Sequence, residues 1–210
     1  MHHNASVVCN REIKHMKTTC LLGSPRRNGN SDTLANRFVQ TAEYYKASVE
    51  TFALSELTYN GCVNLFECKT RLTRCGQSDD LTPVLDSIEN SEVLVLASPI
   101  YFTNLTGQMK LAIDRLFSFF VPDYPTAAVK SRLTPNRHLV LIQTQGEPEN
   151  RYANILDQYS AGFKGLGYDN THLIRAWNVR EPTDISSDAE ILSQCDSVAE
   201  CIYKTPSTFI

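Results

Sequence analysis

Two runs of consecutive apolar residues constrain the fold of this chain more than any other feature. Residues 93–96 read Val-Leu-Val-Leu and residues 139–142 read Leu-Val-Leu-Ile, so both faces of each run must be buried. Strands of this kind belong to parallel sheets that helices cover on both sides. With three weaker runs they alternate with segments whose apolar residues recur at three- and four-residue spacing, which predicts an α/β protein with a doubly wound sheet. The candidate strands are Lys17–Leu22, Ser48–Ala53, Glu92–Ala97, His138–Gln143 and Thr171–Trp177.

The second candidate strand, residues 48–53, has no clean alternation of apolar and polar residues, which indicates a place near an edge of the sheet. Ligands of doubly wound sheets bind beyond the carboxyl ends of the strands. We therefore expect the loops after the first, third and fourth strands to carry the chemistry.

Length and composition predict one ordinary domain. The chain has 210 residues, of which 42% are hydrophobic, and a net charge of −3. We expect a single domain over residues 16–205, preceded by a disordered extension over residues 1–15 that lacks the apolar segment of a secretory signal. The mild negative charge argues against a nucleic-acid partner. No run approaches the roughly 20 apolar residues of a membrane span, so we expect no membrane partner.

The cysteine content favours a reducing environment. Seven cysteines are an odd number, and the sequence carries no recognisable export signal. We therefore expect free thiols and a cytoplasmic protein.

The loop at residues 23–31, Gly-Ser-Pro-Arg-Arg-Asn-Gly-Asn-Ser, joins the first strand to an amphipathic helix. The N–H groups at the start of a helix lack intrahelical partners and carry partial positive charge, so an anion is stabilised there. Serine, asparagine and arginine side chains can add hydrogen bonds and charge. The loop therefore predicts a phosphate site.

Two further loops are expected at the same edge of the sheet. Residues 98–104, Ser-Pro-Ile-Tyr-Phe-Thr-Asn, follow the third strand, and their aromatic rings can flank a flat ligand. We expect Pro99 to end that strand and Asn104 to cap the following helix. Residues 144–147, Thr-Gln-Gly-Glu, follow the fourth strand and give the backbone close access to a ligand at the glycine.

The three loops together predict a planar mononucleotide, flavin mononucleotide (FMN). No Lys-Ser or Lys-Thr pair follows the second glycine of the first loop, which argues against a nucleoside triphosphate. The absence of a G-x-G-x-x-G pattern argues against a dinucleotide held in the usual way.

These segments, with Gly-Gln-Met-Lys at 107–110 and Ile-Asp-Arg at 113–115, resemble the flavodoxin-like NAD(P)H-dependent FMN reductases, in particular the branch shared with iron–sulfur flavoproteins. The resemblance runs from about residue 16 to the last helix. It implies a flavodoxin-like five-stranded parallel sheet of order 2-1-3-4-5 with helices on both faces. It also implies a homodimer or homotetramer with the flavin near the interface.

The resemblance assigns three groups of FMN-binding residues. The first loop holds the phosphate, the second lines the isoalloxazine and ribityl chain, and the third closes the other side. These residues are Ser24, Arg26, Asn28, Asn30 and Ser31, then Pro99, Ile100, Tyr101, Phe102 and Asn104, and finally Thr144, Gln145 and Gly146.

The chain departs from the iron–sulfur branch in the insertion at residues 55–78. Cys62, Cys68 and Cys75 match three of the four closely spaced cysteines of that branch, but Leu65 stands in the place of the other. A cubane cluster normally needs four thiolates and a zinc site four ligands, so we expect no cluster and no metal here.

Two other functions are open. An electron carrier resembling the iron–sulfur flavoproteins would use the same FMN site. Cys20 and Arg26 also have the C-x5-R spacing of low-molecular-weight phosphatases, in which a cysteine attacks the phosphate. The apolar strand position of Cys20 argues against that reaction.

The favoured function is an NAD(P)H-dependent FMN oxidoreductase that passes hydride from the nicotinamide to bound FMN and on to a small-molecule electron acceptor. The cofactor performs the redox chemistry, while the protein positions it. No side chain stands out as a general acid or base, so we assign no catalytic residue.

Overall fold

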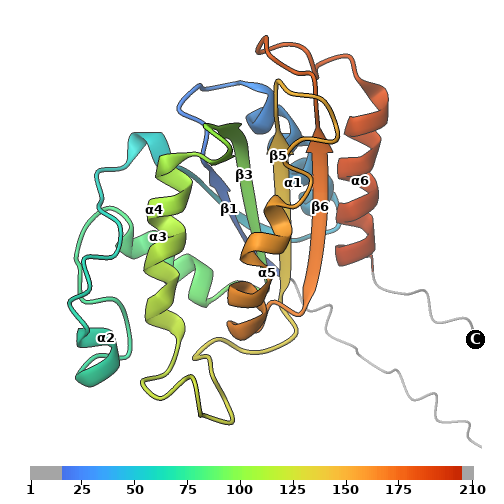
Figure 1. Ribbon diagram of the computed structural model, residues 1–210. Helices are drawn as coiled ribbons and strands as arrows, with labels where there is room; N and C mark the ends of the chain where they lie inside the picture. Colours follow the sequence, from blue (N-terminus) through green and yellow to red (C-terminus); the bar gives the residue numbers. More distant parts are fainter. Residues whose placement is uncertain (1–15, 205–210) are drawn as a thin grey trace, which may run out of the picture.

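The sheet has five parallel strands, and the carboxyl ends of these strands lie at the top of Figure 1. The computed structural model describes residues 16–204, so the expected extension at 1–15 and residue 205 lie outside the described residues. The strand order is β2-β1-β3-β5-β6, which confirms the predicted order 2-1-3-4-5 when the parallel strands alone are counted. The strands are β1 (Lys17–Leu22), β2 (Ser48–Ala53), β3 (Val93–Tyr101), β5 (His138–Thr144) and β6 (Asn170–Ala176).

Helices cover both faces of the sheet, as predicted (Figure 1). The helices α1 (Asn30–Tyr44) and α6 (Ala189–Tyr203) lie together on one face. The other face is covered by α3 (Thr82–Glu89), α4 (Gly107–Arg115) and α5 (Ile155–Gly165). A short helix, α2 (Glu67–Thr70), lies in the insertion, and two 3-10 turns span Leu54–Glu56 and Leu116–Phe119. The described part of the chain contains no helix long and apolar enough to span a bilayer.

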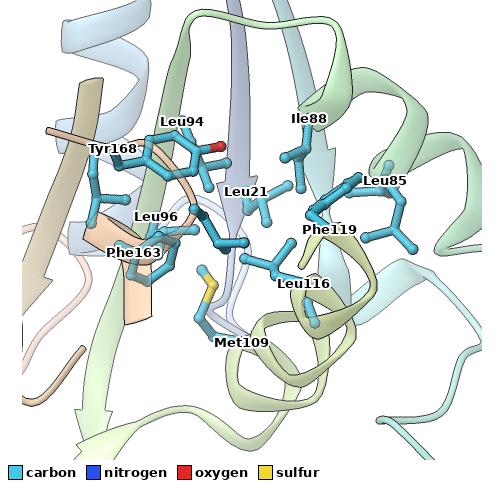
Figure 2. Close-up of a cluster of buried hydrophobic side chains, with 14 of the residues drawn as sticks. Leu21, Leu85, Ile88, Leu94, Leu96, Met109, Leu116, Phe119, Phe163 and Tyr168 are labelled. Atoms are coloured by element: carbon cyan, nitrogen blue, oxygen red, sulfur yellow. The ribbon is translucent and has the colours of Figure 1, made fainter. Parts of the chain in front are cut away.

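The central strands bury both faces, which is why two helical layers are required. Leu94 and Leu96 of β3 contribute to the cluster beneath α3, α4 and α5, while Val93 and Val95 contribute to the cluster beneath α1 and α6. Figure 2 shows the first cluster, in which Met109 of α4 lies among strand leucines. Burial of each such side chain contributes about 1.5–3 kcal/mol. The strand β2 is half exposed at one edge of the sheet, as its irregular pattern predicted.

The expectation that Pro99 ends the third strand is wrong. The strand β3 continues to Tyr101 and folds back onto the two-residue strand β4 (Asn104–Leu105). The pairing of β3 with β1 stops at Ala97, so Pro99 lies where one side of the strand has no partner, which is where proline is tolerated. The turn consists of Phe102 and Thr103, whose φ angles are 42° and 75°. This left-handed backbone is strained for an aromatic and a β-branched residue.

The insertion at 55–78 meets a second long connection, residues 122–136 before β5, beside the end of α4. The guanidinium of Arg132 donates to the carbonyl oxygen of Phe120 at 2.8 Å and to that of Cys68 at 2.8 Å. The buried ammonium of Lys69 donates to the carbonyl oxygens of Phe117 and Phe120, both at 2.6 Å. Two cations therefore fasten the insertions to the same stretch of backbone.

A pair of half-buried histidines connects β5 to β6. Nδ1 of His138 lies 3.1 Å from Nε2 of His172. Burial lowers the pKa of both imidazoles, and the neighbouring His172 lowers that of His138 further. A folded-state pKa below the unfolded value means that the unfolded chain binds more protons, so stability is present above the unfolded pKa and falls as the pH decreases through it.

We therefore expect the free energy of unfolding to be lower at about pH 5.5 than at about pH 7.5, on either side of the unfolded histidine pKa of about 6.5. The double substitution His138→Gln and His172→Gln should remove part of this difference. Urea unfolding of both proteins at the two pH values is the measurement. An identical pH dependence in both would show that the pair does not resist protonation.

Candidate functional site

A cleft of about 250 Å³ opens at the carboxyl edge of the sheet, where the loops after β1, β3 and β5 meet. We call it the cleft. Its walls contain ten of the thirteen residues assigned to FMN, and three further residues. The lining residues are Ser24, Arg26, Gly29, Asn30, Ser31, Pro99, Ile100, Tyr101, Thr144, Gln145, Gly146, Val179 and Arg180.

The start of α1 forms one end of the cleft. Gly29 occupies the N-cap position and supplies no side-chain hydrogen bond, so the first N–H groups of the helix are available to an anion. The preceding residue, Asn28, has a φ of 56°, and its N–H donates to Oδ2 of the buried Asp32 at 3.0 Å. Burial raises the pKa of Asp32, although the Asn28 N–H and the charge of Arg27 oppose the rise. Asn28 thus shapes the loop through its backbone rather than lining the cleft.

Side chains of the first loop make hydrogen bonds within the loop and to the segment after β6. Oγ of Ser24 donates to the carbonyl oxygen of Arg26 at 2.9 Å and accepts from the Arg26 N–H at 3.1 Å. Nη1 of Arg26 donates to the carbonyl oxygen of Arg180 at 3.3 Å, and Nδ2 of Asn30 donates to that of Glu181 at 2.8 Å. The loop is therefore preorganised, with Ser24 closing a tight turn and two predicted phosphate ligands reaching toward the chain after β6.

The second loop supplies the less polar wall of the cleft. Pro99 and Ile100 are half-buried there, and Tyr101 lies beside them at the rim. Two residues assigned to this wall lie outside the cleft lining. Phe102 is fully exposed at the tip of the β3–β4 turn, and Oδ1 of Asn104 is occupied by the Tyr159 hydroxyl at 2.8 Å and the Leu105 N–H at 2.7 Å.

The third loop is organised by a buried amide. Nε2 of Gln145 donates to the carbonyl oxygens of Glu147, Pro148 and Arg151, and its Oε1 accepts from Gln143 at 2.6 Å. This network fixes the backbone on either side of Gly146 without using a ligand.

Two cleft residues, Val179 and Arg180, were missed by the sequence reasoning. They follow β6, whose loop was not counted among the functional ones. The topology could have predicted that the loop after β6 lines the cleft, because the carboxyl end of β6 lies at the same sheet edge as those of β1, β3 and β5.

Thr106 joins the first and second loops, and it also corrects the expected cap of α4. Its Oγ1 donates to the carbonyl oxygen of Gly23 at 2.6 Å and accepts from the Met109 N–H at 3.3 Å, so Thr106 and not Asn104 is the N-cap. Asn104 cannot cap because β4 places it before the helix start. A Cβ on Gly23 would lie 3.0 Å from Cβ of Met109 and 3.1 Å from Oγ1 of Thr106, so a side chain there would push the first loop away from α4.

The substitution Thr106→Val should lower the free energy of unfolding by about 1–3 kcal/mol, because it removes a helix cap and leaves a buried carbonyl unpaired. Urea unfolding measures the loss. Thr106→Ser keeps the hydroxyl and is the matched control. Equal stability of the valine and serine variants would contradict the role of the hydroxyl.

The geometry argues against the phosphatase alternative. Cys20 is fully buried in β1 beneath α1 and α6, and burial together with Asp32 raises the pKa of its thiol to about 12. The thiolate is the nucleophile in cysteine chemistry, so this thiol is inert near neutral pH. Cys20 is also absent from the lining of the cleft.

The cysteine insertion is fixed by an arginine. Cys62, Cys68 and Cys75 line a cavity of about 20 Å³ with Leu65, and within residues 16–204 no three potential metal ligands are grouped to hold an ion. Nε of the buried Arg115 donates to Sγ of Cys75 at 3.0 Å. Three thiols and a leucine do not fit a four-thiolate cluster.

The same guanidinium reaches the end of the insertion. Nη1 of Arg115 donates to Oδ2 of Asp79 at 2.7 Å and to the carbonyl oxygen of Asn60 at 2.9 Å. Burial alone would raise the pKa of Asp79, but the hydrogen bonds and charge of Arg115 hold it below its usual value. Loss of either partner would leave a buried charge uncompensated.

The chemistry of the cleft is that of an anion-binding site with one less polar wall. Among the described residues that line it, two are arginines and none is a carboxylate, histidine, lysine or cysteine. Hydrogen-bond donors and positive charge gather at the α1 end, while Pro99, Ile100 and Tyr101 lie on the wall from β3. The donor set thus suits a phosphate, and the wall suits a flat ring.

Comparisons with known proteins agree with this description. A family model for NADPH-dependent FMN reductase matches residues 16–147. A curated iron–sulfur flavoprotein from Archaeoglobus fulgidus is 34% identical over 104 residues, which are 50% of this chain and 47% of that protein. YwqN of Bacillus subtilis, named as a candidate NAD(P)H-dependent FMN-containing oxidoreductase, is 23% identical over 181 residues, 85% of this chain and 93% of YwqN.

A solved structure supports the fold. The FMN-dependent NADH-azoreductase from Bacillus anthracis, in complex with FMN, has a TM-score of 0.68 and 16% identity, covering 89% of this chain and 99% of the azoreductase. The chain spans about half the length of the iron–sulfur flavoproteins it matches. The family model covers more than half of the chain and includes the loops after β1, β3 and β5, so this chain belongs to the NADPH-dependent FMN reductase family.

Proposed function

We propose that this chain is an FMN-containing oxidoreductase that takes a hydride from NADH or NADPH and passes the electrons to a small acceptor. The observation that carries the proposal is the cleft itself, with an uncapped helix start at one end and Pro99, Ile100 and Tyr101 along one wall. Bound FMN would supply the redox chemistry. The absence of an acid or base from the described cleft lining agrees with a protein that positions its cofactor.

The phosphate end would be held by the first loop. The free N–H groups of α1 and the side chains of Ser24, Arg26 and Ser31 converge on this end of the cleft. Only Nη1 of the Arg26 guanidinium donates to the carbonyl oxygen of Arg180, so its other N–H groups would be available to the phosphate. Charge-assisted hydrogen bonds of this kind are about twice as strong as neutral ones.

The ring would lie between the second and third loops. Pro99, Ile100 and Tyr101 would cover one side and exclude water from it, while Thr144, Gln145 and Gly146 would close the other. Because Gln145 is fixed by its own loop, the backbone around Gly146 would offer hydrogen bonds to ring heteroatoms without rearrangement. Asn28, Phe102 and Asn104 would act only indirectly, since they do not line the cleft.

The proposal also covers the electron acceptor, the oligomeric state and the cellular compartment. A free flavin, a quinone or an azo compound would suit a site open at the sheet edge, and the related fold of an FMN-dependent azoreductase supports this class. We infer one FMN-binding domain over residues 16–205, assembled as a homodimer or homotetramer in the cytoplasm. Free cysteines throughout the described chain agree with a reducing compartment.

A second candidate is an electron carrier of the iron–sulfur flavoprotein type. The identity to such proteins and the three cysteines of the insertion favour it. It would need a fourth ligand in place of Leu65. Iron analysis after anaerobic purification separates the two, because stoichiometric iron would support the carrier and its absence the reductase.

The purified protein, supplied with FMN, should show flavin absorbance bands, and NADPH or NADH added without oxygen should bleach them. The reason is hydride transfer to a flavin held at the open edge of the sheet. Visible spectra before and after the addition are the measurement. A protein that takes up no FMN would end the proposal.

Arg26→Ala should weaken FMN binding by about ten-fold or more, because a charged hydrogen bond to phosphate contributes about 1.5–3 kcal/mol. Ser24→Ala should add to the loss by loosening the turn. Flavin fluorescence titration gives the affinities. Arg27→Ala is the matched control, since Nε of Arg27 pairs with Glu56 at 3.2 Å and does not line the cleft. Equal effects of both arginine substitutions would mean that Arg26 is not a specific phosphate ligand.

A further inference from the structure

The segment at residues 178–185, between β6 and α6, lies over the phosphate end of the cleft. We call it the strap. It is part of the orange-red loop at the top of Figure 1. The strap lies outside residues 16–147, which the family model matches, and none of the residues that the resemblance assigns to FMN lies in it.

Both ends of the strap are anchored. At its start, the N–H of Asn178 donates to the carbonyl oxygen of Glu147 at 3.2 Å, and that of Val179 donates to Gln145 at 3.0 Å. At its end, the Ile185 side chain is fully buried beneath α1 and α6. The strap is therefore a fixed wall and not a loose connection.

A carboxylate shapes the middle of the strap. Oδ2 of Asp184 accepts from the N–H of Arg180 at 2.7 Å and from that of Glu181 at 2.9 Å. These bonds aim the carbonyl oxygens of the same two residues at the first loop. Arg26 donates to the carbonyl oxygen of Arg180, and Asn30 donates to that of Glu181. The strap and the phosphate loop are thus joined through two residues that are themselves assigned to phosphate binding.

The Arg180 side chain lies in the cleft lining. Its Nε donates to the carbonyl oxygen of Gly146 at 3.3 Å, and within the described chain its two terminal nitrogens have no hydrogen-bond partner. A Cβ on Gly146 would lie 3.1 Å from Cγ of Arg180, so the glycine gives the stem of this arginine room to cross the third loop. The two terminal NH₂ groups of Arg180 are therefore available to a ligand in the cleft.

The charges around Arg180 favour an anion. Arg26 and Arg180 are the only charged residues among the described cleft lining, and both are cationic. Three acids lie near Arg180 in the chain or in space, Glu147, Glu181 and Asp184, and none of them lines the cleft. The Asp184 carboxylate is held by the N–H groups of the strap itself. A guanidinium presents paired donors that match a phosphate group.

We propose that Arg180 is a second arginine for the FMN phosphate, supplied by the strap and placed opposite the first loop. This inference rests on the proposed function, since it names a further ligand of the same cofactor. A phosphate at the α1 start would accept hydrogen bonds from the remaining N–H groups of Arg26 and from the terminal NH₂ groups of Arg180. The phosphate of FMN would then lie between two guanidinium groups.

The test compares FMN with riboflavin, which has the same ring and ribityl chain but no phosphate. Both are titrated onto the apoprotein by flavin fluorescence, using the wild-type chain and Arg180→Gln. We expect Arg180→Gln to weaken FMN binding about ten-fold or more and to leave riboflavin binding within about two-fold, since only the phosphate contact is lost. Arg180→Lys keeps the charge without the paired donors and should fall between the two.

Two further measurements make the test specific. Arg74→Gln removes one positive charge from an exposed residue outside the cleft and should leave both affinities unchanged. The FMN affinity of the wild-type chain should fall more steeply with added salt than that of Arg180→Gln, because the exposed charge pair is screened.

Each outcome decides between distinct explanations. Unchanged FMN affinity in Arg180→Gln overturns the inference and leaves the proposed function standing. An increased KM for NADPH but not for NADH, with FMN affinity unchanged, also overturns it, because Arg180 would then serve the coenzyme's 2′-phosphate. Failure of the wild-type chain to bind FMN overturns the proposed function and this inference together.

Discussion

The burial of both faces of β3 and β5 is the constraint on which the rest of the structure depends. Since Val, Leu and Ile occupy consecutive positions in these strands, helices must cover both sides of the sheet. No face is then left for a ligand, and polar side chains accumulate where the strands end. The cleft lies at the carboxyl edge, where the loops after β1, β3 and β5 converge.

Most of the fold could be predicted from the sequence, because apolar periodicity reports burial directly. The five parallel strands, their order and the edge position of β2 agree with the pattern. The predicted end of β3 does not agree with the structure, because proline was expected to end the strand. A strand without a partner on one side tolerates proline, and β3 has no β1 partner beyond Ala97. The cap of α4 was misplaced for the same reason, since the short hairpin moved Asn104 away from the helix start.

The candidate site was predictable only where motif and topology coincide. The loops after β1 and β5 line the cleft largely as expected, because their residues directly follow buried strands. Phe102 does not line the cleft, and its position could not be predicted because no propensity favours an aromatic residue in left-handed backbone at an exposed tip. The topology placed the loop after β6 at the same edge, but its hydrogen bonds with Arg26 and Asn30 could not be predicted, because they join segments that are distant in the sequence. In the cysteine insertion, the sequence alone shows that Leu65 stands where a fourth thiol would be needed. The hydrogen bond from Arg115 that holds Cys75 could not be predicted from the sequence.

The joining of the strap to the first loop has a consequence for how the site is completed during synthesis. The hydrogen bond from Arg26 to Arg180 connects residues 154 positions apart. A ribosome that has released the chain as far as β5 has delivered the uncapped start of α1 and the wall from β3, but not the segment that spans them. At that stage the cleft still lacks its outer wall. A polypeptide that ends before residue 178 therefore lacks the strap, and its cleft stays open on that side even with the first three loops intact.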